Sequence, residues 1–150
     1  MFADLLRRLS ASDPARLPEP DSRVALAALM VRIARTDGDY SMEEVARIDR
    51  ILMHRHGLDA WGAEALRREA EVLEADAPDT VRFTRAIKDA TALEDRVAVV
   101  EALWAVVLAD GERDEEEAGL LRLLANLLGI NDRDSNLARQ RVEAQIGPKK

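Results

Sequence analysis

Two stretches of the chain are apolar on nearly every side of a predicted helix. They cover roughly residues 23–36 and about residues 93–109, and charged side chains interrupt them at few positions. A helix without a polar face belongs in the middle of a helical bundle, where neighbouring helices cover it. The pattern therefore predicts two central helices, and Trp104, inside the second stretch, is expected to anchor the core.

An amphipathic stretch follows each apolar one, after a turn that contains Asp-Gly. Its apolar residues recur at helical spacing, and Gly57 and Gly129 then suit helix ends in the left-handed conformation. The first apolar stripe consists of Val45, Ile48, Ile51 and Leu52, and the second of Ala118, Leu121, Leu124, Ala125 and Leu128.

Three more helices are expected after residue 58. Asp59 can cap a helix that runs to about residue 75, with Trp61 half exposed near its start. Pro78 suits the first turn of a helix that reaches about residue 90, and a last helix is expected at about residues 135–145. Strand-like alternation is hard to find. The expected fold is all-α, a single compact bundle of seven or eight helices.

Residues 1–21 are expected to form a short helix and a proline-rich linker ahead of one helical domain at residues 22–150. The apolar side of the short helix either packs on its own domain, which is the favoured alternative, or contacts a partner or a membrane surface. Three of the five prolines lie between residues 10 and 22, which indicates an extended linker. The apolar side consists of Phe2, Leu5, Leu6 and Leu9.

The Asp-Gly turns belong to an internal repeat. The motif Asp-Gly-x5-Glu starts at Asp37 and recurs 73 residues later at Asp110, and acidic and apolar positions recur with it until a one-residue slip near Gly57. The motif matches the second half of a calcium-binding loop, but Ile33 and Arg35 stand where the first acids belong. The match predicts a duplicated helix–turn–helix unit. The predicted repeats cover about residues 22–59 and 93–131.

Helix geometry alone explains part of this motif. A glycine follows each central helix, where it is favoured just past the last turn. Ser41 with Glu44, and Asp114 with Glu117, have the spacing of capping boxes, in which the cap side chain and the third helical residue satisfy each other's backbone amides. On this interpretation the motif is a turn only.

The other acids of the motif are not needed by a turn. Asp37 and Asp110 lie near the negative end of a helix dipole, where a carboxylate is disfavoured, and Asp39 and Glu112 follow the glycines. Clustered carboxylates repel one another unless a cation or a basic partner is present. Their oxygen atoms suit calcium, magnesium or manganese rather than zinc. The predicted ligands are Asp37, Asp39, Glu44, Asp110, Glu112, Asp114 and Glu117.

Charge and composition narrow the classes of partner. The net charge of −7 argues against nucleic acid and favours cations or basic protein surfaces. The chain has no cysteine, which fits the cytoplasm, and no apolar run reaches the roughly 20 residues of a membrane span. No Ser/His/acid group and no phosphate-binding glycine loop is visible, so enzymatic activity is not expected.

The buried helix ending in "TDGD" or "ADGE", the acidic helix start that follows and the duplication resemble the tellurite-resistance TerB family. Its TerB-like relatives include the N-terminal domain of DjlA-type membrane-anchored co-chaperones. The resemblance covers about residues 22–145. It implies an all-helical domain with clustered acidic residues, proposed to bind divalent cations and linked to stress-response and membrane-associated complexes. No J-domain motif is present, so a co-chaperone role does not carry over.

Two functions fit these observations. The first is a non-enzymatic module that binds a divalent cation and docks onto protein partners in a stress-related assembly. The second is a metal-free structural or interaction domain whose acidic face meets a basic protein surface.

Overall fold

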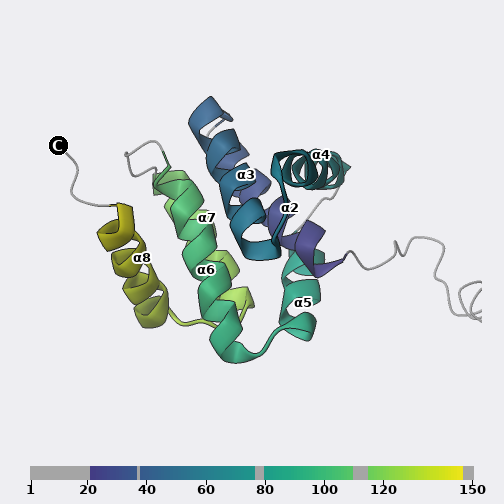
Figure 1. The fold of residues 1–150 in the computed structure, drawn as a ribbon. Coiled ribbons are helices and arrows are strands. Elements are labelled where there is room, and N and C mark those ends of the chain that lie inside the picture. The colour runs from purple at the N-terminus through teal and green to yellow at the C-terminus, as the bar shows by residue number, and fades with distance from the viewer. Residues whose placement is uncertain (1–20, 37, 77–79, 110–114, 147–150) are drawn as a thin grey trace, which may run out of the picture.

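The computed structural model describes residues 21–36, 38–76, 80–109 and 115–146, and over these ranges the chain forms seven helices and no strand (Figure 1). The all-α bundle expected from the sequence is confirmed. The N-terminal helix and linker predicted within residues 1–20 lie outside the described residues. The helices are α2 (Ser22–Arg35), α3 (Met42–His56), α4 (Ala60–Asp76), α5 (Val81–Ala90), α6 (Leu93–Val107), α7 (Glu115–Leu127) and α8 (Asp132–Ile146).

The two helices without a polar face, α2 and α6, lie at the centre of the bundle, as predicted. Ten of the fourteen residues of α2 are buried, whereas six of the fifteen residues of α6 are. Trp104 of α6 is fully buried, which confirms it as a core residue. Trp61 of α4 is 86% exposed, more than the half-exposed position expected from the sequence, because it lies in the first turn of a helix whose buried residues are Ala63 and Ala70.

The helices pack as two similar units. α4 packs mainly against α2 and also against α3, and α8 packs mainly against α6 and also against α7. Between the units, α2 contacts α6, α3 contacts α6, and α7 contacts α2. This is the pattern that an exchange of two repeats about a two-fold axis produces.

The repeated unit extends through a third helix, beyond the predicted limits. Asp59 accepts a hydrogen bond from the Gly62 amide at 2.7 Å ahead of α4, and Asn131 accepts one from the Asp134 amide at 2.8 Å ahead of α8. Asp59 and Asn131 stand 72 residues apart. At the same offset, the Arg67–Glu71 ion pair of α4 recurs in α8 as the pair of Arg139 with Glu143.

Two helix starts refine the boundaries expected from the sequence, and two helix ends confirm them. The side chain of Asn131 starts α8 at Asp132, three residues before the predicted position. α5 begins at Val81, and Pro78 lies outside the described residues. The left-handed glycines are confirmed: Gly57 has φ of 64° and Gly129 of 84°.

Within the described ranges, no helix combines the length and apolar character that crossing a membrane requires.

The capping box at the start of α3 leads to a testable prediction. Ser41→Ala removes the side-chain acceptor that holds the Glu44 amide at 3.1 Å. The free energy of unfolding should fall by about 1 kcal/mol, measured by chemical denaturation. Ser41→Asp keeps an acceptor and serves as the control. Equal stability of the alanine variant and the wild type would show that the cap contributes nothing.

Candidate functional site

The C-terminal ends of the two central helices lie on the same side of the bundle. Figure 1 shows α3 beginning and α6 ending at the upper side of the molecule. The guanidinium of Arg47, in the second turn of α3, donates to the carbonyl of Ala105 near the end of α6 at 3.3 Å. Because α3 starts directly after the turn that follows α2, this bond brings the end of α6 close to that turn. A surface shared by both Asp-Gly turns requires this arrangement.

Three of the seven predicted metal ligands lie in the described part of the chain, and four lie outside it. Asp39 is exposed, while Glu44 and Glu117 are each only 3% exposed. Among the described residues, no group of three or more His, Cys, Asp or Glu side chains could hold a metal ion. The complete ligand set therefore stays a prediction. The residues outside the description are Asp37, Asp110, Glu112 and Asp114.

Glu44 serves the start of α3. One of its carboxylate oxygens accepts a hydrogen bond from the Ser41 amide at 3.0 Å, and its own amide donates to the Ser41 hydroxyl. The capping box predicted from the sequence is thus confirmed in the first repeat. Glu117 stands at the equivalent position of α7 and is buried to the same degree. A role for Glu44 as a metal ligand would require its carboxylate to leave the cap or to be shared with it.

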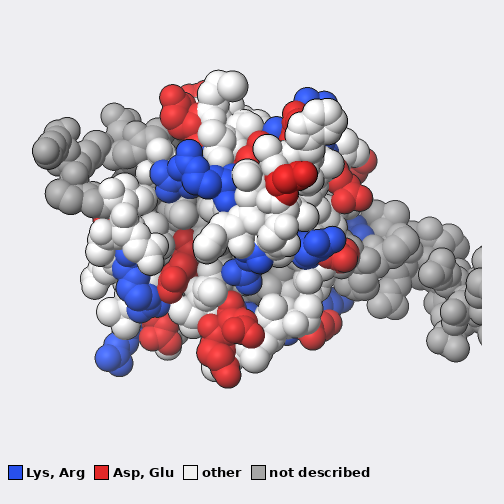
Figure 2. Space-filling view, viewed as in Figure 1, with Lys and Arg blue, Asp and Glu red and all other residues white. Residues whose placement is uncertain are grey.

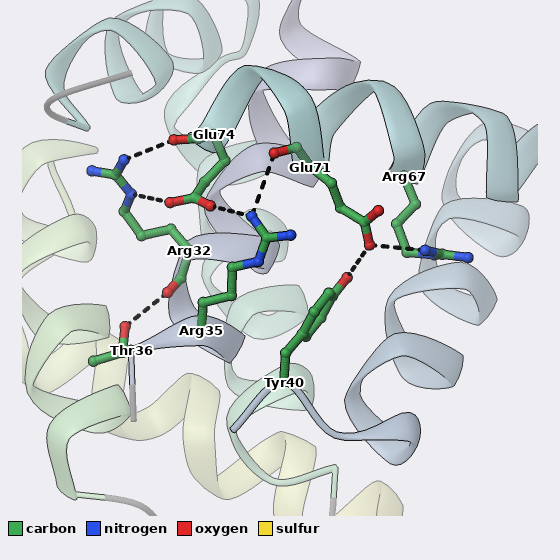
Figure 3. Close-up of polar contacts among 7 residues, drawn as sticks. All are labelled: Arg32, Arg35, Thr36, Tyr40, Arg67, Glu71 and Glu74. Atoms are coloured by element: carbon green, nitrogen blue, oxygen red, sulfur yellow. Dashed lines mark hydrogen bonds and ion pairs between the residues drawn. The ribbon is translucent and has the colours of Figure 1, made fainter. Parts of the chain in front are cut away.

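A polar network that the sequence did not reveal holds the first turn against α4 (Figure 3). Tyr40 follows the Asp-Gly turn, and its hydroxyl donates to the Glu71 carboxylate at 2.7 Å. Arg67 donates to the same carboxylate oxygen at 2.8 Å and to Asp49 of α3 at 2.6 Å. The network thereby connects the turn, α3 and α4.

Two arginines at the C-terminal end of α2 complete the network. Arg32 and Arg35 donate to the two carboxylate oxygens of Glu74 at 3.1 and 2.8 Å. They also donate to backbone carbonyls of α4, and the Arg35 guanidinium lies 5.1 Å from the centre of the Tyr40 ring, within cation–π range. Cationic side chains at this end of α2 also complement its dipole. The carboxylates of Glu71 and Glu74 are therefore already neutralised by arginine.

The network sets the protonation of its members. Burial alone would raise the pKa of Glu71, but hydrogen bonds from Tyr40 and Arg67 and the positive charges of Arg67 and Arg35 outweigh it, and the pKa is lowered. Burial, together with the hydrogen bond to Glu71 and the charge of that carboxylate, raises the pKa of Tyr40 above its usual value. At neutral pH, Tyr40 is therefore a donor to an ionised Glu71.

A pH-dependent stability is expected from Glu71. Its folded pKa lies below the unfolded value of about 4.3, so its carboxylate stabilises the fold above that pH, and this contribution is lost as pH falls through the folded pKa. Glu71→Gln should therefore be less stable than wild type at pH 7, and the difference should shrink below about pH 4. Urea denaturation over a pH series measures it.

The matched control is Glu69→Gln, an exposed position of the same helix. It should stay within about 0.5 kcal/mol of wild type throughout. A deficit of Glu71→Gln that is independent of pH would refute the ionised network.

The two arginines of α2 have no counterpart in the second repeat. Arg32 and Arg35 correspond at the repeat offset to Ala105 and Leu108, which cannot form ion pairs. A signal was present in the sequence: the arginines of α2 interrupt an otherwise apolar helix, and Arg67 and Glu71 have the i,i+4 spacing of an ion pair. Their partners were not visible, because Arg32 and Glu74 are 42 residues apart.

Exposed carboxylates remain at the starts of both amphipathic helices. Asp39 and Glu43 are exposed at the start of α3, and Glu115 and Glu116 are exposed in the first turn of α7. The helix dipoles favour acids at these positions. Figure 2 shows acidic groups interspersed with basic ones on the face drawn there. These exposed acids at the two helix starts are the residues of the candidate site for which the structure gives a position.

A family model for the tellurite resistance protein TerB matches residues 23–140, which is more than half of the chain. The matched region spans α2 to α7 and most of α8, including both Asp-Gly turns. Comparison with curated proteins gave no match, and comparison with solved structures gave none either. The family match, the all-helical bundle and the paired turns agree with the resemblance found in the sequence. The chain belongs to the TerB family.

Proposed function

We propose that the protein is a non-enzymatic TerB module that binds a hard divalent cation weakly through the acids at its two Asp-Gly turns. Calcium, magnesium and manganese are the candidate ions. The module would engage protein partners of a tellurite- or stress-resistance assembly, including membrane-associated ones, and no nucleic acid. The observation that carries the proposal is the bond from Arg47 to Ala105, which brings the end of α6 close to the turn after α2.

The number of oxygen ligands supports a shared site. Calcium takes six to eight oxygens, and one half-loop supplies about half of them. Acids from both turns, with backbone carbonyls and water, reach that number together. Binding should be weak because the acids at the starts of α3 and α7 lie at the surface and because Glu44 already holds a helix cap.

The absence of catalysis is part of the proposal. TerB-family domains are in general not catalytic. In this chain, the titratable side chains with shifted pKa around the first turn, Tyr40, Arg67 and Glu71, hydrogen-bond to one another between elements of the bundle, which is a structural use. A cytoplasmic location stays a prediction from the sequence.

Removing the acid before each glycine tests the cation. With calcium, magnesium or manganese at about ten times the dissociation constant, the wild-type melting temperature should rise by about 3–6 °C. Asp37→Asn combined with Asp110→Asn should abolish this rise. The control is Glu69→Gln with Asp89→Asn, which removes the same charge at exposed positions of α4 and α5 and should keep the rise. The cation role fails if the wild type does not respond, or if both double variants respond equally.

The metal-free interaction domain remains the second candidate, and one observation favours it. The Glu44 carboxylate is committed to the cap of α3 and is only 3% exposed, which leaves fewer acids for a cation. If the acids at the turns merely repel one another, the double asparagine variant should be more stable than wild type without any metal. A basic protein surface would then be the partner that offsets the repulsion.

A further inference from the structure

A groove of about 630 Å³ runs along α6 between α3 and α8. Figure 1 shows these two helices on opposite sides of α6. Ala98, Ala102 and Ala105 of α6 line the groove, with Ile51 of α3 and Val142 of α8 beside them. Its lining is more apolar than polar, so an apolar helix face would bury favourably there.

The corresponding positions of the first repeat are covered. At the repeat offset of 73 residues, Ala98 and Ala102 of α6 correspond to Ala25 and Leu29 of α2. Ala25 and Leu29 are completely buried, whereas Ala98 is exposed and Ala102 partly exposed. α5 explains the difference, since it packs along α2 and also contacts α7. α2 and α7 are the repeat counterparts of α6 and α3. Among the described helices, none covers α6 in the way that α5 covers α2.

The order of helices along the chain indicates which segment could cover α6. α5 immediately precedes the central helix of the second repeat, yet it covers the central helix of the first. If the two repeats are exchanged about the two-fold axis that relates them, the segment that precedes α2 should cover α6. That segment is residues 1–12, and it carries the apolar pattern required. The buried residues of α5 are Phe83, Thr84 and Ile87, and the same spacing recurs in Leu5, Leu6 and Leu9.

We propose that residues 1–12 dock as an amphipathic helix in the groove over α6 of the same molecule. The nine residues 13–21 can span roughly 30 Å when extended, about the diameter of a small domain. The rim of the groove carries Arg50, Arg55 and Glu101. The segment carries an acid, Asp4, and two bases, Arg7 and Arg8, so it can form ion pairs with either sign of charge on the rim. The docked segment completes two units of four helices each, and it requires no bound cation.

A spin label on the N-terminal segment tests the docking in the full chain. The chain has no cysteine, so Ser10→Cys can be labelled with a nitroxide at a single site. The amide NMR signals of Ile51, Ala98 and Ala102 should be lost and should return when the label is reduced. The signal of Asp89, in α5 on the other unit, should persist.

Two controls make the result decisive. Leu5→Asp with Leu9→Asp, in the labelled background, should restore the groove signals, whereas Arg8→Gln should not. A mixture of labelled protein with unlabelled, isotope-enriched protein should show no loss. Loss in that mixture would mean docking on a second copy and would overturn the proposal. Retention of the groove signals in the labelled protein would also overturn it and leave the groove to a partner helix.

Discussion

Trp104→Ala is expected to lower the free energy of unfolding by about 3–5 kcal/mol. The side chain is fully buried in α6, and its indole N–H donates to the hydroxyl of Ser135 in α8 at 3.1 Å. The substitution removes a large apolar group, leaves a cavity that the surrounding helices fill only partly, and breaks the buried hydrogen bond that joins the two helices. Chemical denaturation followed by circular dichroism is the appropriate measurement, because the remaining tryptophan is exposed.

The chain offers a matched control for this change. Trp61→Ala is the same substitution at a side chain that is 86% exposed, and it should stay within about 0.5 kcal/mol of wild type. If both variants lost the same stability, or if Trp104→Ala melted with the wild type, the burial of Trp104 would not be what holds α6 to α8.

Phe83→Ala should have a comparable effect, again about 3–5 kcal/mol. α5 has only ten residues, and a helix of that length is marginal unless its apolar face is packed. Phe83 is the largest of its three buried side chains. Its loss should weaken the contact of α5 with α2 and expose a central helix that is otherwise covered.

Hydrogen exchange measures the local effect of this change. Amide protection in α5 and in the facing part of α2 should fall further in Phe83→Ala than in the rest of the bundle. Arg85→Ala, at an exposed position of the same helix, is the control and should change little. Uniform loss of protection in both variants would show that α5 is not held by Phe83.

Local signals in the sequence were enough to predict the central helices and the two ends of α3. The apolar residues of α2 and α6 leave no polar face, and Ser41 with Glu44 and Gly57 mark helix boundaries through backbone geometry that any fold must satisfy. The helices α4 and α8 were predicted, but their membership of the repeat was missed for a physical reason. Small residues occupy corresponding buried positions, such as Ala63 in α4 and Ser135 in α8, and they give little apolar signal by which the two helices could be matched.

The candidate site was less predictable because its contacts join distant parts of the chain. Tyr40 and Glu71 are 31 residues apart, and Arg35 and Glu74 are 39 residues apart. The sequence showed both the acids and the arginines but not which of them form ion pairs. The capping role of Glu44, in contrast, depends on a three-residue spacing and was visible directly.

Manganese titration of the isotope-enriched protein tests the proposed cation site most directly. Paramagnetic Mn²⁺ bound between the turns should weaken the amide signals of Gly38 and Asp39 and those of Glu115 and Glu116 over the same concentration range. Excess magnesium should restore them, and the signals of Glu69 and Asp89 should be unaffected. Equal weakening at all exposed acids, or no selective weakening at either turn, would contradict a shared cation site in this TerB module.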